Sequence, residues 1–411
     1  MTEQLAIEGG NPVRARPMPP LTLGASLIGA EEKALVGEVL DSKCLFRHYG
    51  ASTPHFADDF EREFREQIGV RYALATATGS GAYFCAMRAL DVGPGDEVII
   101  PAFGWITDYV MVDLFGATPV LAAIDESLNL SPEDFQAKIT DRTRAVVIVH
   151  YQGGAARVDE IVRIARQHDI KVFEDAAQAC GGEFNGKKLG AWGDISCYSF
   201  QTNKIITTGD GGMLVTNDQD MYEKAVRYHD LGLLRNAFEA NLEGPPRTAP
   251  MMGLQWRITE QAAAVGLAQL RKLPRIASDC RERAAFLRAR LSEAFPRLAF
   301  RACLPENDMG ILVAFDLRSA DNVAFFAKAY EAEGLPYGPT SWCETLCHIP
   351  QVAVLLEKKG VRARSVFETT AGIDGRMAKL GLVPAYSRED MRDIASGSVK
   401  VLSAMVAKGM L

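Results

Sequence analysis

The chain has 411 residues, of which 48% are hydrophobic and 24% charged, so it can bury a sizeable core. Its formal net charge is −7, and lysine and arginine are dispersed, which argues against nucleic acid as the main partner. We find neither a signal peptide nor an apolar run of about 18 residues, so we expect a cytoplasmic protein without a membrane segment. The scattered cysteines suit reduced thiols better than disulfides.

The first part of the chain predicts an arm followed by a parallel sheet. Residues 1–30 are punctuated by proline and glycine, and we expect them to wrap the surface or to reach a partner subunit. From about 56 to 240, helical patterns such as 158–169 alternate with short apolar runs, which is typical of an α/β fold with a largely parallel sheet covered on both faces. The clearest strand-like runs are EVIIP (97–101), AVVIVH (145–150), KVFED (171–175) and GMLVT (212–216).

The second part predicts a separate, smaller unit. Residues 236–252 have little periodicity and three prolines, so we expect a long loop. The helical pattern that follows is expected to end at Pro274. From about 280 the pattern becomes mixed, with a strand near 311–317. We therefore expect an arm over 1–30, a large domain over 31–275 and a smaller C-terminal α+β domain over 276–411.

Two glycine- or aromatic-rich turns stand where a parallel sheet binds ligands, at the carboxyl ends of strands. Thr78-Gly79-Ser80-Gly81 precedes a helical pattern, so its backbone N–H groups could hold a phosphate, although an ordinary helix cap explains it equally well. Trp105 follows the run at 97–101 and could stack on a flat ring or simply pack in the core.

Two ionisable side chains follow later strands. Asp175 ends an apolar strand, with Gln178 three residues further on, and a carboxylate there needs a cationic partner unless it caps a helix. Lys204 lies between an apolar stretch and a glycine-rich turn, so it is either a surface lysine or a desolvated amine suited to Schiff-base chemistry. Together the four places supply an amine, a carboxylate, a stacking ring and a phosphate cradle, which are the groups that pyridoxal phosphate needs.

These motifs resemble those of the DegT/StrS-type sugar aminotransferases, which have the aspartate-aminotransferase-like fold of pyridoxal phosphate enzymes (fold type I). The likeness runs from about 30 to 275. It rests on SFQTNKIITTGDGG (199–212), EDAAQA (174–179), PGDEVIIPAFGW (94–105) and GLQWRITEQAAAVGLAQL (253–270).

The resemblance implies a role for each matched position. Lys204 would form the Schiff base with pyridoxal 5′-phosphate, and Asp175 would pair with the ring nitrogen. Gln178 would bond near the ring oxygen and Trp105 would stack on the ring. The remaining matched positions would hold the phosphate, and these are Gly79, Ser80 and Ser199.

The resemblance also implies a homodimer with its active site at the subunit interface. An Asn of the family's G-x-N-x-R motif reaches the neighbouring subunit's phosphate, and here Gln255 replaces it with a longer amide. Asp210 stands where Glu is more usual, and Tyr83 stands where a small aliphatic residue is common. These departures concern the substrate more than the cofactor.

The implied activity is transfer of an amino group, with glutamate as the expected donor, to a keto- or aldehydo-sugar in amino-sugar biosynthesis. Lys204 favours transamination over sugar dehydration, because related dehydratases carry histidine at this position. A lyase, aldolase or decarboxylase on the same fold is the alternative, and a non-catalytic regulator is a further one. Three stretches look similar to the 8-amino-3,8-dideoxy-octulosonate aminotransferases: 149–161, the loop before 253, and 376–391.

Substrate contacts are expected from the segment Phe46-Arg47-His48-Tyr49, from the 236–252 loop and from the C-terminal domain. No metal site is expected. The one candidate, Cys343-x-x-x-Cys347-His348, has no second ligand pair of matching spacing, so we expect these to be packing residues.

Overall fold

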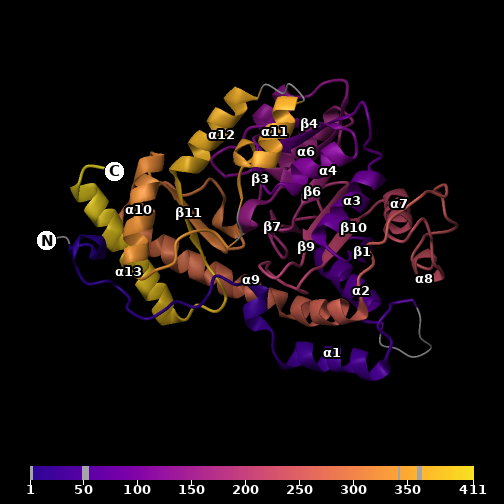
Figure 1. Ribbon diagram of the computed structural model, residues 1–411, viewed down its shortest axis with the longest axis horizontal. Coiled ribbons are helices and arrows are strands. Elements are labelled where there is room, and N and C mark those ends of the chain that lie inside the picture. The colour runs from indigo at the N-terminus through magenta and orange to yellow at the C-terminus, as the bar shows by residue number, and fades with distance from the viewer. Residues whose placement is uncertain (1–2, 49–54, 341–342, 359–362) are drawn as a thin grey trace.

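The larger part of the molecule is built around a central sheet of seven strands (Figure 1). The computed structural model describes residues 3–48, 55–340, 343–358 and 363–411. Every neighbouring pair in the sheet is parallel except the two pairs made by β10 (Gly212–Thr216), so the predicted, largely parallel sheet is present. In spatial order the other strands are β1 (Tyr72–Thr76), β9 (Ile195–Ser199), β6 (Lys171–Asp175), β5 (Thr143–Val149), β2 (Glu97–Pro101) and β4 (Thr118–Ala122), with β10 between β1 and β9.

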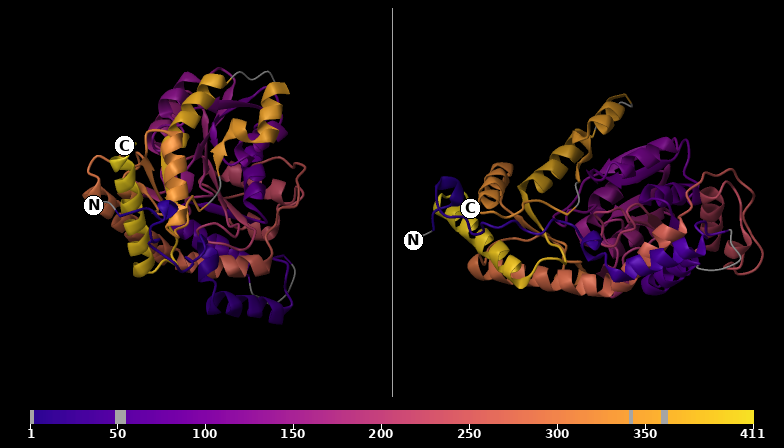
Figure 2. Two further views of the ribbon diagram at one scale, coloured as in Figure 1. Left: turned by 60° about the vertical axis from the view of Figure 1, so that its left-hand side comes forward. Right: turned by 60° about the horizontal axis from the view of Figure 1, so that its bottom comes forward.

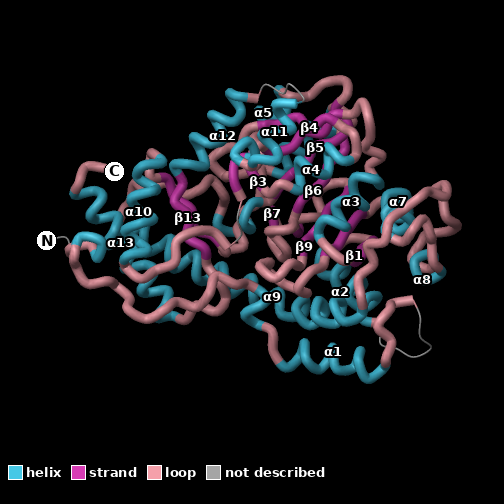
Figure 3. Tube along the Cα trace, viewed as in Figure 1, coloured by secondary structure: helices cyan, strands magenta, loops and turns pink. Residues whose placement is uncertain are grey.

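Helices cover both faces of this sheet because its strands carry apolar residues on both sides. In β10, Met213 and Val215 pack into one core and Leu214 into the opposite one. The helices on the Leu214 side are α3 (Gly79–Ala89), α4 (Thr107–Leu114) and α7 (Gln219–His229). The helices on the opposite side are α2 (Phe56–Ile68), α5 (Pro132–Ala137), α6 (Val158–Gln167) and α9 (Glu260–Ala294). Figure 3 shows the strands as a layer between helices.

The predicted end of a helix at Pro274 is wrong. Helix α9 begins after the cap Thr259, contains Pro274 and continues to Ala294. A proline in a helix loses one backbone hydrogen bond, but apolar side chains on both sides of Pro274 are buried and keep the helix intact, among them Leu270, Leu273 and Ile276. Figure 2 shows α9 running beneath both parts of the molecule. The predicted domain limit at 275 falls inside this helix, and the domain limits stay a prediction.

The C-terminal part is a small α+β unit. Its strands β11 (Leu312–Asp316) and β13 (Met377–Gly381) pair antiparallel. Around them lie α10 (Ala320–Ala332), α12 (Arg364–Arg376) and α13 (Arg388–Ala407), whereas α11 (Pro350–Lys358) packs Val352 and Leu356 into the core of the large part. One short strand of this part, β12 (Glu344–Thr345), pairs with β3 (Phe103–Gly104) of the large part, so the two parts meet beside Trp105.

The N-terminal arm lies along the chain's own surface. Arg14 forms ion pairs with Asp390 (2.8 Å) and Asp393 (2.7 Å) of α13, and two short 3-10 helices, Ala6–Glu8 and Gly24–Leu27, precede α1 (Ala30–Ser42). The expected loop at 236–252 contains one helical turn, α8 (Asn236–Glu239). Short strands β7 (Glu183–Phe184) and β8 (Lys187–Lys188) form a separate hairpin. None of the described helices has the length and apolar character needed to cross a membrane.

Candidate active site

A cavity of about 770 Å³ opens at the carboxyl ends of β6 and β9. In a parallel sheet these ends meet at one edge, which brings together residues far apart in the sequence. All the predicted site residues except Gln255 line its wall: Gly79, Ser80, Trp105, Asp175, Gln178, Ser199 and Lys204.

The first turn of α3 forms one wall of the cavity. Thr78 caps the helix by accepting the N–H of Gly81 (2.9 Å), and Gly79 and Ser80 begin it. A Cβ added to Gly79 would lie 2.7 Å from the Cβ of Ser199, so only glycine allows this close approach between α3 and the end of β9. The first amides of a helix lack partners within it and attract anions, so this wall suits a phosphate.

Asp175 lies at the end of β6 and is 7% exposed. Its Oδ1 accepts the N–H of Ala177 (2.8 Å), which fixes the carboxyl at the cavity wall. Burial raises the pKa of the Asp175 carboxyl, while the Ala177 N–H and the nearby Lys204 amine oppose that rise. A cation bound beside it would favour the carboxylate form further.

Lys204 lies in the loop after β9, and its side chain reaches the same cavity as Asp175. Its backbone is held by two hydrogen bonds, from its N–H to Gln201 O (2.9 Å) and from the N–H of Gly24 to its carbonyl (3.0 Å). Burial lowers the pKa of the Lys204 amine, and Cys343 and Asp175 oppose the shift. A lysine with a lowered pKa is a better nucleophile and proton acceptor near neutral pH.

The amide of Gln178 is held by residues of both parts of the chain. Its Oε1 accepts from the backbone N–H (3.2 Å) and the Nε2 (3.1 Å) of Gln152, and its Nε2 donates to the Sγ of Cys343 (3.3 Å). Gln152 itself accepts from Thr340 (2.7 Å). The second hydrogen on Nε2 remains for a ligand oxygen in the cavity, which fits the predicted role.

Trp105 and Gln255 lie differently with respect to the cavity. Trp105 stands between β3 and α4, lines the cavity and is 43% exposed, so its ring is accessible for stacking. Gln255 is exposed, pairs by a backbone bridge with Asp230 and does not line the cavity of its own chain. Its expected contact with a neighbouring subunit stays a prediction.

The cavity therefore provides the four groups that pyridoxal phosphate requires, on residues that face one space. The fit rests on the glycine-dependent cradle at Gly79, the buried carboxyl of Asp175 and the depressed pKa of the Lys204 amine. Within the described residues, no group of three or more His, Cys, Asp or Glu side chains is placed to hold a metal ion.

Comparison with known proteins identifies the family of the chain. The model of the DegT/DnrJ/EryC1/StrS aminotransferase family matches residues 26–397. The chain belongs to this family. The GDP-perosamine synthase of Caulobacter vibrioides is 37% identical over 259 residues, which are 62% of this chain and 66% of that protein. The chain thus spans about two thirds of that relative's length.

Two further matches cover more of this chain than the first one does. A putative L-glutamine:3-amino-2,3-dideoxy-scyllo-inosose aminotransferase of Micromonospora echinospora is 32% identical over 85% of this chain and 83% of that protein. The solved aminotransferase of Psychrobacter cryohalolentis has a TM-score of 0.79 at 26% identity, covering 96% of this chain and 99% of that one. The predicted family, fold class, enzyme class and pyridoxal phosphate cofactor are confirmed.

Some residues of this aminotransferase's cavity were not singled out from the sequence. Thr22 comes from the N-terminal arm, and only the fold brings it to the cavity. Four further lining residues follow strand ends, a position that could have indicated them, and these are Thr107, Gln201, Thr202 and Asn203. Cys197 lines the cavity from within β9, and Gly209 from the turn before β10. Tyr83 and Asp210, noted only as departures from the family pattern, also line the cavity.

The segment that was expected to contact substrate, residues 46–49, includes side chains that interact with other residues of the same chain. Arg47 is buried and pairs with Glu61 (2.8 Å) and Asp58 (2.7 Å). His48 lies 3.8 Å from Asp230, and burial lowers its pKa to about 4. Neither lines the cavity, and Tyr49 lies outside the described residues, so substrate contact through this segment stays a prediction.

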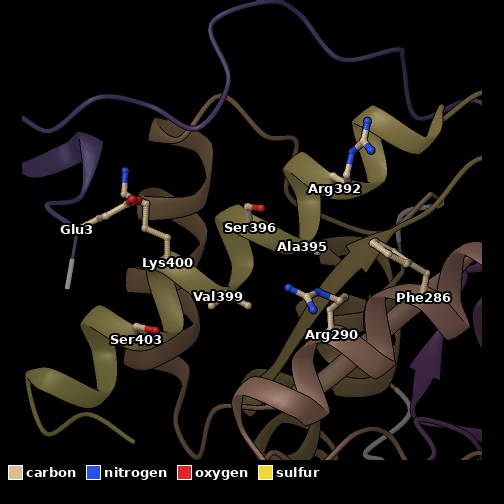
Figure 4. A pocket seen from close by; sticks show the side chains of 9 residues that line it. All are labelled: Glu3, Phe286, Arg290, Arg392, Ala395, Ser396, Val399, Lys400 and Ser403. Carbon is tan, nitrogen blue, oxygen red and sulfur yellow. The ribbon is translucent and has the colours of Figure 1, made fainter. Parts of the chain in front are cut away.

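A second cavity of about 680 Å³ lies between α9 and α13 of the aminotransferase (Figure 4). Two of its cations are committed to carboxylates: Arg290 pairs with Glu293 (2.7 Å) and Lys400 with Glu333 (2.8 Å). None of the predicted site residues lines it, so the chemistry belongs to the cavity at Lys204.

Proposed function

We propose that the chain transfers an amino group from an amino acid, with glutamate as the expected donor, to the carbonyl carbon of a sugar. The observation that carries this proposal is the placement of Lys204 and Asp175 in one cavity whose far wall is the phosphate-binding turn at Gly79. An amine, a carboxylate and an anion site in this arrangement suit both halves of a transamination.

Each residue has a task that follows from its position. When bound, pyridoxal phosphate supplies an aldehyde that accepts an amino group and a ring that withdraws electrons. Lys204 would hold the cofactor and, once released as a free amine, would take a proton from the donor's α-carbon and deliver it to the carbon that had been the cofactor's aldehyde. Such general acid–base work accelerates a reaction by about 10²–10⁴-fold. Asp175 keeps a proton on the ring nitrogen, and Gly79, Ser80 and Ser199 bind the phosphate.

A sugar acceptor is supported by what the similar proteins are named for, GDP-perosamine synthesis among them. The stretches 149–161 and 376–391 are the basis for a narrower candidate, an octulosonate with a carbonyl at carbon 8. Both acceptors present a carbonyl carbon to the incoming amino group, so they require the same chemistry from Lys204 and differ in what binds the rest of the molecule.

We also propose that the enzyme works as a homodimer in which Gln255 reaches the partner's phosphate. Trp105 and Gln255 are both exposed in a single chain. The segment leading to Gln255 carries exposed apolar side chains, a composition typical of a surface that another chain covers: Leu231 (56% exposed), Leu233 (48%), Met252 (87%) and Leu254 (44%). A cytoplasmic location stays an expectation.

The test is steady-state kinetics of the purified protein with pyridoxal phosphate, glutamate and each candidate acceptor. Release of 2-oxoglutarate with ping-pong kinetics would support transamination. Release of carbon dioxide or of an aldehyde without a keto acid would instead favour a decarboxylase, aldolase or lyase. The acceptor that gives the highest kcat/KM would decide between the nucleotide-linked sugar and the octulosonate.

The dimer proposal needs its own measurement. Sedimentation velocity should give a dimer, and Gln255→Ala should weaken binding of pyridoxal phosphate while leaving the dimer intact. A wild-type protein that sediments as a monomer, or a Gln255→Ala variant that binds pyridoxal phosphate as tightly as the wild type, would refute this part of the proposal.

A further inference from the structure

A second carboxyl group, that of Asp108, lies behind the wall of the cavity. Asp108 is in the first turn of α4, three residues after Trp105, and is 1% exposed. Its carboxyl folds back over Gly104, where a Cβ would approach its Oδ2 to 3.3 Å. Because Gly104 has no side chain, it leaves room for this buried carboxyl behind the cavity wall.

Asp108 meets two other buried polar groups there. Its carboxyl lies close enough to the Asp175 carboxyl and the Tyr83 hydroxyl to interact with both electrostatically, and Tyr83, which comes from α3, is 1% exposed. Within the described part of the chain, neither Oδ1 of Asp108 nor the Tyr83 hydroxyl makes a hydrogen bond of standard geometry to another group. Buried polar atoms without partners are costly. The Tyr83 hydroxyl can donate to one oxygen of Asp108, but two ionised carboxylates offer acceptors only, so the approach of Asp108 to Asp175 lacks a donor.

The charges around the pair indicate what the missing donor is. Two buried carboxyl groups in contact cannot both ionise without strong repulsion. Burial raises the pKa of Asp108 well above its usual range, and Asp175 raises it further. The titratable groups that face Asp108 from the packed elements are Tyr83 of α3, Asp175 of β6, Cys197 of β9, Lys204 of the loop after β9, and Cys343 before β12. Lys204 is the only cation among them.

We propose that Asp108 is a positioning residue that keeps one proton and donates it to Asp175, while the Tyr83 hydroxyl donates to the other oxygen of Asp108. This arrangement provides the donor that the buried atoms lack. It also leaves the pair with a single negative charge, which matches the single positive charge of a protonated ring nitrogen. The catalytic carboxylate is thereby fixed in orientation without adding a second charge to the site.

The inference rests on the proposed function for its role, but the proton itself can be tested without the cofactor. If Asp108 stays protonated in the folded chain and ionises in the unfolded chain, the folded chain binds one more proton than the unfolded chain above about pH 4. The equilibrium constant for unfolding of the apo wild type then rises about tenfold per pH unit relative to a variant that lacks this group.

The experiment compares urea unfolding of the apo wild type, Asp108→Asn and Asp108→Ser at pH 5, 6 and 7. For each unit by which the pH rises, the folding equilibrium constant of both variants should increase about tenfold relative to that of the wild type. The serine variant is used if the asparagine variant does not fold. The matched control is Asp141→Asn, on an exposed turn, which should stay parallel to the wild type. Parallel pH profiles for all proteins would overturn the proposal.

A second readout separates positioning from packing. Asp108→Asn keeps a donor toward Asp175 and should bind pyridoxal phosphate within about threefold of the wild type, whereas Asp108→Ala should bind it about tenfold more weakly, because it loses a hydrogen bond to a charged group. Equal losses in the two variants would overturn the donor role. A wild type that binds no pyridoxal phosphate would contradict the proposed function instead, and the apo unfolding profiles would still decide the proton.

Discussion

Replacing Gly79 by alanine tests the phosphate cradle at the start of α3. The added methyl would lie 2.7 Å from the Cβ, 3.0 Å from the Oγ and 3.1 Å from the Cα of Ser199. Because one of these atoms is backbone, α3 and β9 must move apart at the point where both are proposed to bind the phosphate. Overpacking of this kind costs about 1–3 kcal/mol. If that cost falls on the bound state, affinity for pyridoxal phosphate drops about 5- to 150-fold.

The assay is titration of the apo protein with pyridoxal phosphate and, separately, with pyridoxal, which lacks the phosphate. The loss should appear for pyridoxal phosphate and be small for pyridoxal. The control is Gly37→Ala, in α1, where an added Cβ meets nothing within 4 Å. It should stabilise the fold by about 0.5–1 kcal/mol and leave both affinities unchanged. An equal loss for the two ligands in Gly79→Ala would refute a phosphate cradle at this turn.

Two further predictions concern the residues that support the site. Glu174 accepts the N–H groups of Gly190 (2.8 Å), Trp192 (2.7 Å) and Gly193 (2.6 Å) and pairs with His150 (3.0 Å), so Glu174→Gln turns an NH₂ toward two of these donors. At about 1.5–3 kcal/mol for each bond to a charged group, it should lower the free energy of unfolding by about 3–6 kcal/mol in urea, and a loss below about 1 kcal/mol would contradict this. His229 is fully buried, and burial lowers its pKa from 6.5 to about 3. Below pH 6.5 the unfolded chain therefore binds a proton that the folded chain does not, and stability falls as the pH drops. Between pH 6.5 and 5 the stability lost through this group is about 1.7 kcal/mol, and His229→Phe should reduce the total loss over that range by the same amount. An unchanged slope would be evidence against a neutral, buried His229.

The sequence was sufficient for the parts of the site that follow directly from strands. The runs 97–101, 171–175 and 212–216 coincide with β2, β6 and β10, and parallel pairing then places Asp175 and Lys204 at one edge. It was insufficient where tertiary packing decides the outcome. Apolar burial on both sides of Pro274 carries α9 past the proline, which a local rule cannot anticipate.

Contacts between distant parts of the chain were likewise invisible. The hydrogen bond from Gln178 to Cys343 joins residues 165 positions apart and depends on the pairing of β12 with β3. Asp108 reads in the sequence as one more polar position in a helical pattern. Only its burial against Tyr83 and Asp175 marks it as part of the site.

The most direct test of the central claim locates the lysine that holds the cofactor. The protein is mixed with pyridoxal phosphate, its visible absorption is recorded before and after glutamate, and a borohydride-reduced sample is mapped by peptide mass spectrometry. We predict an absorption band of the lysine-bound cofactor, its loss on addition of glutamate, and a label on Lys204 that is absent from Lys204→Ala. A label on a different lysine, or no label at all, would contradict the assignment of Lys204 and with it the proposed function.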